Sequence, residues 1–344
     1  MRAVCYDVPR GVPEVREVGV PECPPDGVLV RVHATGLCRS DWHGWMGHDP
    51  DIRFPHVPGH EFAGTVHTVG ADVTGWTAGD RVTTPFVNAC GSCGPCAAGQ
   101  HQVCAAQTQP GFSHWGSFAE YVVVRHAAVN LVRLPDGLDH VTAAGLGCRF
   151  ATSYRAIAQV GEVRDGEWVV VHGCGGVGLA AVMVAAARGA RVIAVDVSAT
   201  ALDLAASIGA SHTLDAGAGP VAAQVLALTG GGADVTVDAI GRASVIADSL
   251  ASLRIQGRHL QVGLLVGPDA RPPTDLGDVM YRELRVLGSH GMAAHRYPAM
   301  LDDIAAGRLD PARLVTRTIS LDEAPAALAS FASAPPTGTT VIVL

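Results

Sequence analysis

The chain contains no lysine, because all 24 of its positively charged residues are arginines. A lysine nucleophile or a lysine Schiff base is therefore excluded. Charged residues make up only 16% of the sequence, the net charge is −8, and no basic run occurs. Binding to nucleic acid or to an anionic membrane surface is not expected, since both need clustered positive charge.

Long apolar segments are also absent. The longest unbroken stretch in the middle of the chain, 179–187, is far shorter than the roughly 20 residues that span a bilayer. The N-terminal sequence lacks the apolar core of a signal peptide. Nine cysteines in such a chain point to reduced thiols and metal binding, so we expect a cytoplasmic protein.

The length of 344 residues and the hydrophobic content of 48% predict a well-packed protein of about two domains. The first stretch, 1–150, carries short β-type runs broken by glycine and proline, typical of a mostly antiparallel β lobe. The second, 151–291, alternates strand and helix patterns, which indicates a doubly wound parallel sheet. The third, 292–344, is expected to return to the first lobe with a helix and terminal strands. The predicted fold class is α/β.

The individual elements follow from local patterns. In the first lobe we expect strands at 27–32, 62–66 and 118–124. In the second stretch we expect six strands, at 168–171, 191–195, 212–214, 235–237, 259–262 and 285–287. Helices are predicted over 177–188, ended by Gly189, and from the N-cap Ser198 to Ile208, ended by Gly209. The proline-rich segments 267–273 and 334–338 are expected to be loops.

Four cysteines follow one another at C-x2-C-x2-C-x7-C spacing in a glycine-rich polar stretch. Zn²⁺ is commonly held by four thiolates in a closed tetrahedron, and closely spaced cysteines can all reach one centre. Gly91, Gly94, Pro95 and Gly99 supply the turns that such a loop needs. Two disulfides are the alternative, which the expected reducing compartment disfavours. The set consists of Cys90, Cys93, Cys96 and Cys104.

A glycine-rich turn follows the predicted strand at 168–171 and precedes a predicted helix, as in dinucleotide-binding domains. Its glycines would make a tight turn (Gly173), let a pyrophosphate approach (Gly175, followed by Gly176 and Val177) and let the helix pack on the sheet (Gly178). An acidic residue, Asp196, ends the next strand. A structural glycine turn alone would not account for this carboxylate, which can bind both ribose hydroxyls and would repel a 2′-phosphate. Since 197–201 contains no cation, NAD is predicted rather than NADP.

A second set of metal-binding residue types is scattered over the first lobe, in the segments 38–43, 59–61 and 147–148. Spacing alone would not unite these segments. Together with the four-cysteine stretch and the glycine-rich turn, however, they occur in the same order as in zinc-dependent alcohol dehydrogenases of the medium-chain dehydrogenase/reductase family. The whole chain resembles this family.

The resemblance implies a catalytic zinc held by Cys38, His60 and Cys148, with a fourth position open, as is established for alcohol dehydrogenase. Asp41 would orient His60, and Glu61 would sit behind the metal. Ser40 would bond the alcohol oxygen and pass its proton through the cofactor ribose to His43. The residues implied at the cofactor and substrate are Arg39 at the pyrophosphate, Thr152, Val177, Val262 and Leu264 along the NAD site, and Phe86 in the substrate pocket.

The same resemblance implies a GroES-like catalytic domain, 1–150 with 292–344, and a Rossmann domain, 151–291, that binds NAD. The implied activity is hydride transfer between a small alcohol and NAD, giving an aldehyde or ketone, by a homodimer or homotetramer. A polyol or amino-alcohol dehydrogenase is the rival within the family, although Cys148 favours the alcohol dehydrogenases. A non-catalytic zinc-containing nucleotide-binding protein is the rival outside it. Four aromatic residues are expected to make an apolar pocket: Trp42, Trp45, Phe112 and Trp115.

Overall fold

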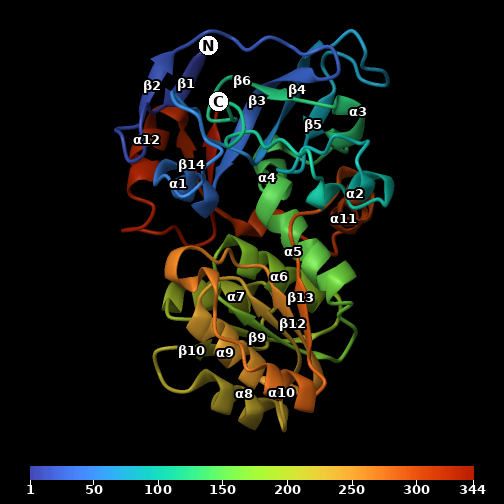
Figure 1. The fold of residues 1–344 in the computed structure, drawn as a ribbon, viewed down its shortest axis with the longest axis vertical. Coiled ribbons are helices and arrows are strands. Elements are labelled where there is room, and N and C mark those ends of the chain that lie inside the picture. Colours follow the sequence, from blue (N-terminus) through green and yellow to red (C-terminus); the bar gives the residue numbers. More distant parts are fainter. The chain divides into compact units, whose positions relative to one another are not determined.

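The computed structural model describes residues 1–344, which divide into two compact units. Unit 1 comprises Met1–Ala151 and Gly291–Leu344, and unit 2 comprises Thr152–His290. These limits differ by one residue from the boundaries expected from the sequence. Figure 1 follows the chain through both units. No helix is long and apolar enough to cross a membrane.

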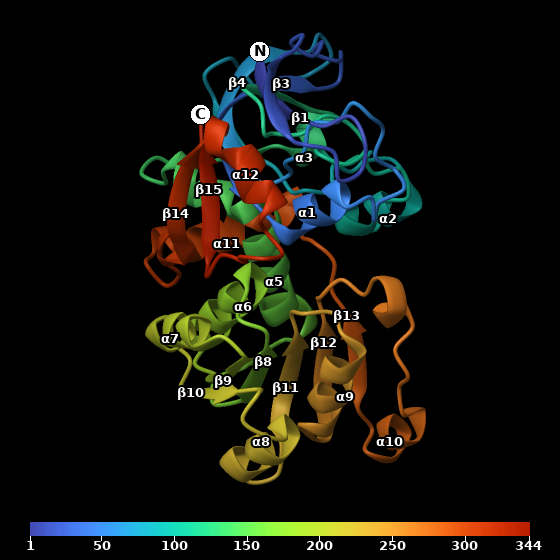
Figure 2. The ribbon, with the colours of Figure 1, turned by 90° about the vertical axis from the view of Figure 1, so that its left-hand side faces the viewer.

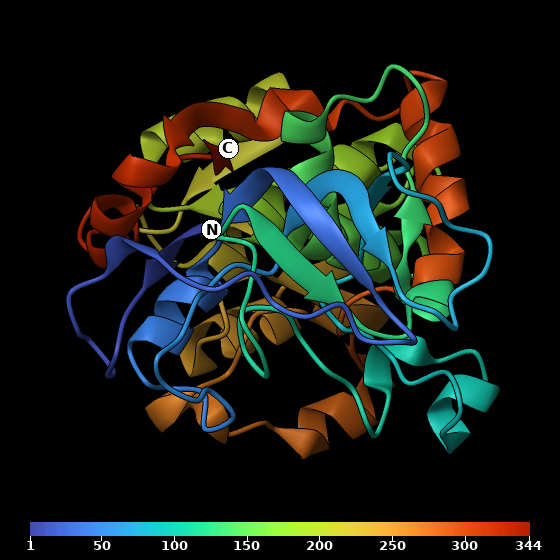
Figure 3. The ribbon, with the colours of Figure 1, turned by 90° about the horizontal axis from the view of Figure 1, so that it is seen from above.

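Unit 1 is built on a seven-stranded, mostly antiparallel sheet in the order β14-β15-β3-β4-β5-β7, with β6 also paired to β3. Its centre is β3 (Val28–Leu37), a long run rich in valine whose two faces are both largely buried. Figure 3 shows β3 beside β4 and β6, the strands with which it pairs antiparallel. The other strands are β4 (Phe62–Val69), β5 (Arg81–Thr83), β6 (Tyr121–Val124), β7 (Val132–Arg133), β14 (Val315–Ser320) and β15 (Thr339–Val343), and a separate hairpin is formed by β1 (Arg2–Cys5) and β2 (Glu14–Glu17).

The C-terminal segment completes this sheet, as expected. Strand β15 pairs antiparallel with β3, and β14 lies parallel to β15. Figure 2 shows helix α12 (Ala324–Ala329) beside these two strands, where Leu328 packs with Ile319 and Ile342. The sequence analysis expected one helix in this segment, but the structure has two, α11 (Tyr297–Ala305) and α12. The sequence analysis missed the second helix because it is only six residues long, too short to show a periodic pattern.

Short helices connect the strands of unit 1. They are α1 (Arg39–Trp45), α2 (Gly94–Ala97), η1 (His101–Val103), α3 (Ala127–Asn130), α4 (His140–Ala144), the π-helical turn η2 (Leu146–Phe150), η5 (Ala294–Arg296), η6 (Pro311–Leu314) and η7 (Leu321–Glu323). Helix α5 (Ala151–Arg155) follows η2 directly, and a second π-helical turn, η3 (Ala156–Val160), follows α5.

Unit 2 is a parallel sheet of six strands in the order β10-β9-β8-β11-β12-β13. Its central strands are almost fully buried, because a parallel sheet is covered by helices on both faces. All six predicted strands are present: β8 (Trp168–His172), β9 (Arg191–Asp196), β10 (His212–Asp215), β11 (Ala233–Asp238), β12 (Leu253–Gln261) and β13 (Arg285–Gly288). The prediction placed β12 too late, since this strand begins at Leu253 and contains a register shift against β11.

The helices of unit 2 connect these strands. The two predicted helices are confirmed as α6 (Gly176–Ala187) and α7 (Ala199–Ser207). The Ser198 side chain accepts a hydrogen bond from the Ala201 N–H and so caps α7. The remaining helices are α8 (Val221–Thr229), α9 (Ala243–Ala251), α10 (Leu276–Tyr281) and the short turn η4 (Gly267–Ala270), which lies in a segment expected to be a loop. The predicted fold class is confirmed.

Candidate functional site

The scattered cysteines and histidine of unit 1 converge on one point. The metal-binding atoms of Cys38, His60, Glu61 and Cys148 all lie within 4.8 Å of one another. Pairing of β3 with β4 brings the end of one strand to the start of the other, where the Gly36 N–H bonds the Glu61 carbonyl at 2.7 Å. A bond from the Phe86 N–H to the Gly147 carbonyl, at 2.9 Å, fixes the turn that carries Cys148. The sheet topology therefore assembles what the sequence separates.

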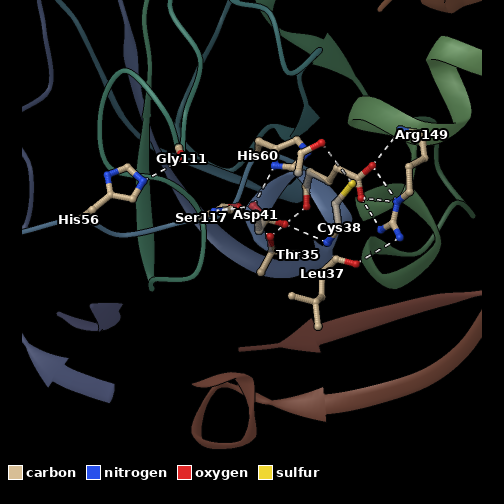
Figure 4. A network of polar contacts seen from close by, with 12 residues as sticks. Thr35, Leu37, Cys38, Asp41, His56, His60, Gly111, Ser117 and Arg149 are labelled. Atoms are coloured by element: carbon tan, nitrogen blue, oxygen red, sulfur yellow. Dashed lines mark hydrogen bonds and ion pairs between the residues drawn. The ribbon is translucent and has the colours of Figure 1, made fainter. Parts of the chain in front are cut away.

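Asp41 orients two of these residues. One carboxylate oxygen accepts the backbone N–H of Cys38 at 2.8 Å, and the other lies 2.9 Å from Nδ1 of His60 (Figure 4). Because the Asp41 carboxylate accepts a hydrogen bond from Nδ1–H of His60, the lone pair of the ring is on Nε2. That atom is buried and has no hydrogen-bond partner. A buried imidazole nitrogen left unpaired beside two thiols fits a zinc ion, which takes nitrogen and sulfur ligands of this kind.

Glu61 belongs to a different contact. Its carboxylate forms a buried ion pair with Arg149, whose Nε lies 3.0 and 2.8 Å from the two oxygens (Figure 4). The backbone N–H of Arg149 donates to the same carboxylate at 2.8 Å, and Nη1 donates to the Leu37 carbonyl at 3.2 Å. Since both oxygens of Glu61 are bonded to Arg149, the set that remains for a metal is Cys38, His60 and Cys148.

Arg149 was missed by the sequence analysis as a functional residue. The only signal was its position directly after Cys148. No local pattern pairs an arginine with a glutamate 88 positions earlier in the chain. The pair is important electrostatically, because burial raises the pKa of Glu61 and the guanidinium of Arg149 opposes this rise.

The thiols are electrostatically uneven. A hydrogen bond from Cys148 holds the pKa of Cys38 well below its usual range against the effect of burial, and the guanidinium of Arg149 acts in the same direction. The pKa of Cys148 is raised by the same hydrogen bond and by burial. Burial would lower the pKa of His60, but the charges and hydrogen bonds of Asp41 and Cys38 together outweigh it and raise that pKa. Negative charge is thus already favoured at Cys38, as a metal thiolate requires.

The four cysteines of the glycine-rich loop form a second cluster. Their sulfurs lie 3.4 Å apart for Cys93 and Cys96, 3.6 Å for Cys93 and Cys104, and 3.5 Å for Cys104 and Cys90. A disulfide needs a sulfur–sulfur distance of about 2.05 Å. All nine cysteines of the chain are free thiols, so the alternative of two disulfides is wrong. The cluster matches a closed tetrahedral zinc site.

The local backbone builds this second cluster. Gly91 and Gly99 have φ values of 76° and 73°, which a residue with a side chain rarely adopts. Backbone and side-chain hydrogen bonds from Ser92 lower the pKa of Cys90 to about 5, whereas burial raises the pKa of Cys96 to about 12. The four thiols therefore cannot all ionise unless a cation neutralises them, which Zn²⁺ would do.

The glycine-rich turn of unit 2 has the geometry expected of it. Gly173 has φ 93°, and a Cβ on Gly178 would lie 1.7 Å from the Gly173 carbonyl oxygen, so no other residue fits. Gly175 is the N-cap of α6, and nothing lies within 4 Å of the position of its Cβ. Asp196 accepts the Cys174 N–H at 2.6 Å and the Ser198 N–H at 2.9 Å. Its carboxylate is therefore held next to the turn at the N-terminus of α6, where a pyrophosphate can bind.

The other predicted cofactor residues are placed as follows. Thr152 is buried, and its hydroxyl has no partner. Gly176 and Val177 open α6, and the Val177 carbonyl accepts the Ser153 hydroxyl at 2.7 Å. Val262 follows β12, and Leu264 is exposed two residues later. Arg39 is an exposed residue that begins α1.

The predicted relay residues share α1. The Ser40 hydroxyl lies 3.9 Å from the sulfur of Cys38, and His43 is half-buried one turn later. The ring of Phe86 lies 6.3 Å from that of His60, and the ring of Phe112 lies 5.2 Å from it. Two aromatic rings therefore border the candidate metal site.

The expected aromatic pocket is only partly present at His60. Trp42 packs against His43 on α1. The indole N–H of Trp45 donates to the Gly11 carbonyl at 2.7 Å, and that of Trp115 donates to the Pro55 carbonyl at 3.0 Å. Trp115 packs on the cluster of Ala3, Val57 and their neighbours. Of the four aromatics predicted for the pocket, Phe112 is the one with a ring contact to His60.

Comparison with known proteins identifies the family. Residues 24–136 match the alcohol dehydrogenase GroES-like domain, and residues 176–306 match the zinc-binding dehydrogenase domain. An alcohol dehydrogenase of Geobacillus stearothermophilus is 35% identical over 80% of each chain. The structure of alcohol dehydrogenase TADH from Thermus sp. ATN1 superposes with a TM-score of 0.91 at 34% identity, covering 100% of this chain and 99% of that one. A zinc-binding dehydrogenase from Sinorhizobium meliloti 1021, bound to NADP, is similar over 100% and 99% of the two chains, at 32% identity and a TM-score of 0.89.

The chain therefore belongs to the zinc-dependent alcohol dehydrogenases of the medium-chain dehydrogenase/reductase family. The predicted family is confirmed, and with it zinc as a cofactor and alcohol oxidoreduction as the class of activity.

Proposed function

We propose that the protein catalyses hydride transfer between an apolar alcohol and NAD, with the catalytic zinc held by Cys38, His60 and Cys148. The observation that carries this proposal is the buried, unpartnered Nε2 of His60 beside the two sulfurs. When bound, zinc supplies a Lewis acid that makes an alcohol oxygen more acidic. The four-cysteine cluster would hold a second, structural zinc.

The chain's own residues have separate tasks in this proposal. Asp41 fixes the ring of His60, and Arg149 binds the carboxylate of Glu61. The Ser40 hydroxyl would accept the proton that the alcohol releases and pass its own proton through the cofactor ribose towards His43. His43 would pass that proton to solvent, and because burial lowers its pKa below the ordinary value of about 6.5, it releases the proton readily near neutral pH. Phe86 and Phe112 border His60 and exclude water from it.

The nucleotide would be bound by the glycine turn and Asp196, with Arg39 at the pyrophosphate and Thr152, Val177, Val262 and Leu264 near the nicotinamide. The choice between NAD and NADP depends on this chain's own residues, since a relative carries NADP. Asp196 uses one lone pair of each oxygen for the Cys174 and Ser198 N–H groups and keeps others for the ribose hydroxyls. No cation follows it at 197–201 to bind a 2′-phosphate.

Steady-state kinetics with both nucleotides test the choice. A hydrogen bond to a charged group is worth roughly 1.5–3 kcal/mol, so wild type should prefer NAD by at least about tenfold in kcat/KM. Asp196→Ala should weaken the binding of NAD and reduce the difference in kcat/KM between NAD and NADP. Asp196→Asn, which keeps one oxygen for a backbone N–H, separates loss of the charge from loss of the turn. A higher wild-type kcat/KM with NADP would refute the role of Asp196.

A substrate panel followed at the absorbance of the reduced nicotinamide tests the activity itself. Primary, secondary and aromatic alcohols should be turned over better than polyols and amino alcohols, because the two phenylalanine rings at His60 offer no polar partner. Highest kcat/KM with a polyol would contradict the substrate class alone. No turnover of any alcohol by protein that holds both zinc ions and binds NAD would favour the non-catalytic alternative.

We also propose that the chain self-associates through the open edge of the unit 2 sheet. Strand β13 ends that sheet, and four large apolar side chains on β13 and α10 are 50–84% exposed: Leu276, Met280, Tyr281 and Val286. An exposed apolar patch at a strand edge is typical of an interface. Sedimentation should show a dimer or tetramer that Val286→Asp dissociates, and a wild-type monomer would refute the proposal.

Because the cysteine ligands must stay reduced, we assign the protein to the cytoplasm.

A further inference from the structure

Helix α1 ends in a turn that folds the chain back on the helix. The N–H of Gly47 donates to the Gly44 carbonyl at 3.0 Å, and the N–H of His48 donates to the His43 carbonyl at 3.0 Å. Gly47 has φ 79°, the left-handed conformation that such a Schellman turn requires. The turn therefore places His48, five residues later in sequence, beside His43 on the last turn of the helix.

The two histidine rings are in direct contact. Nδ1 of His43 lies 2.9 Å from Nδ1 of His48, and the ring centroids are 5.2 Å apart. Trp42 packs edge-on against both rings, at 5.0 Å from His43 and 5.9 Å from His48. His43 is half-buried, whereas His48 is exposed to solvent. The pair thus connects a partly enclosed ring to one in free contact with water.

A contact of 2.9 Å between two ring nitrogens fixes the hydrogen between them. Two N–H groups would clash and two lone pairs would repel, so one nitrogen donates and the other accepts. This contact uses Nδ1 of His43 and leaves Nε2 as its one free nitrogen. If His43 is to take up a proton, Nε2 must carry a lone pair, and Nδ1 must then be the donor to His48.

We propose that His48 is a positioning residue for proton transfer: it accepts the Nδ1–H of His43, keeps Nε2 of His43 available as a base, and shares the proton that His43 takes up. The inference rests on the proposed function, in which His43 ends the relay. The proton adds to Nε2 of His43, whose Nδ1–H···Nδ1 contact to His48 becomes a charge-assisted hydrogen bond. The Nδ1 hydrogen of His43 then moves to Nδ1 of His48, and the Nε2–H of the exposed His48 is released to water, after which exchange with water restores the resting positions of the hydrogens.

The surroundings of His43 disfavour a resting positive charge on its ring. Burial lowers the pKa of His43, and His48 and Arg39 lower it further, whereas the Cys38 thiolate opposes them. Arg39 is the first residue of α1, Cys38 is its N-cap, and His48 lies in the turn that follows the helix. Two protonated rings in contact would repel each other, which is why His48 contributes to this lowering.

Two substitutions of His48 separate hydrogen bonding from packing. His48→Phe keeps a ring against Trp42 but removes the acceptor. His48→Asn places an amide oxygen where Nδ1 accepts, and should restore the hydrogen bond in part. His67→Phe is the matched control, since His67 is an exposed histidine on β4 that packs against Tyr121.

The experiment combines ¹⁵N NMR of the histidine rings in zinc-loaded full-length protein with the pH profile of kcat. In wild type, neutral His43 should carry its hydrogen on Nδ1. In His48→Phe that preference should be lost, and kcat should fall about two- to tenfold, the range expected for one net hydrogen bond. Imidazole buffer should restore much of the rate, and His48→Asn should lie between the two.

Two results would overturn the proposal. One is a neutral His43 in wild type that carries its hydrogen on Nε2. The other is a His48→Phe protein whose His43 nitrogen shifts, pH profile and buffer dependence match those of His67→Phe. The NMR measurement needs no turnover, so it decides the histidine pair even if the proposed activity fails. Failure of the activity alone would appear as wild-type protein with Nδ1–H on His43 but no alcohol oxidation.

Discussion

The two cysteine-containing sites of unit 1 differ in how the chain builds them. The four-cysteine cluster lies within one loop between residues 90 and 104, shaped by glycines with positive φ. The set of Cys38, His60 and Cys148 spans 110 positions of the chain and meets because β3 pairs with β4 and because the Phe86–Gly147 backbone bond fixes the turn of Cys148. The first can be predicted from spacing. The second requires the fold, and in the proposed zinc site its three ligands would leave a fourth position open.

Their surroundings differ in the same way. The four-cysteine cluster is supported by backbone N–H groups that point at sulfur, such as those of Cys90 and Ala106 towards Cys104. The open site is enclosed by buried charges, namely Asp41 and the Glu61–Arg149 pair. Buried charges are costly when unpaired. Substitutions in the four-cysteine loop should therefore affect only the loop, whereas substitutions around the open site should destabilise a larger part of unit 1.

The largest expected effect comes from removing a ligand of the open site. His60→Ala or Cys148→Ala should lower kcat by roughly 10³-fold or more, because a Lewis acid stabilises charge by several kcal/mol. Binding of NAD, measured by calorimetry, should change little, since the glycine turn lies in unit 2. Cys90→Ser in the loop is the control and should keep its turnover per folded molecule. Wild-type turnover in His60→Ala, after confirmed loss of one zinc, would contradict a zinc mechanism.

The next effect concerns stability. Arg149→Met leaves the buried carboxylate of Glu61 without its partner, which should cost about 3–5 kcal/mol in the free energy of unfolding. The double variant Arg149→Met with Glu61→Gln should recover part of this, because the buried charge is gone. Urea denaturation would measure both.

The control for this prediction is Arg16→Met, which removes exposed ion pairs with Asp7 and Glu14 and should change the free energy of unfolding little, because solvent screens such pairs. If Arg149→Met destabilised the protein no more than Arg16→Met, the contrast between an enclosed open site and a self-contained loop would be lost.

The fold was easier to predict from the sequence than the residues of the candidate site. The valine-rich strands of unit 2, the cap at Ser198 and the glycine stops were predictable because each depends on local chemistry. The ion pair of Arg149 and Glu61 was not, because it joins positions 88 apart through the sheet. His48 was overlooked as well, since its contact with His43 depends on the left-handed conformation of Gly47.

The last expected effect lies outside both sites. Burial, with a further contribution from His259, lowers the pKa of His172 in unit 2 to about 3. The unfolded chain, with a histidine pKa of about 6.5, binds this proton more tightly. Stability should therefore fall as the pH drops from 6.5 towards 3, by about 1.4 kcal/mol per pH unit for this group.

His172→Gln should remove this dependence of stability on pH. Relative to wild type, the variant's free energy of unfolding should therefore rise between pH 7 and pH 4.5, until it approaches or exceeds that of wild type. Fluorescence of Trp168, the one tryptophan of unit 2, would follow that unit apart from acid release of metal in unit 1. Parallel pH dependences for the two proteins would show that His172 is not the group responsible.

Zinc stoichiometry tests the central claim most directly, that one chain holds a closed structural site and a separate open catalytic site. Purified wild type should contain about two zinc ions per chain, and His60→Ala and Cys90→Ser should each contain about one. Only His60→Ala should be inactive. One zinc in wild type, with the zinc content unchanged by Cys90→Ser, would contradict the account.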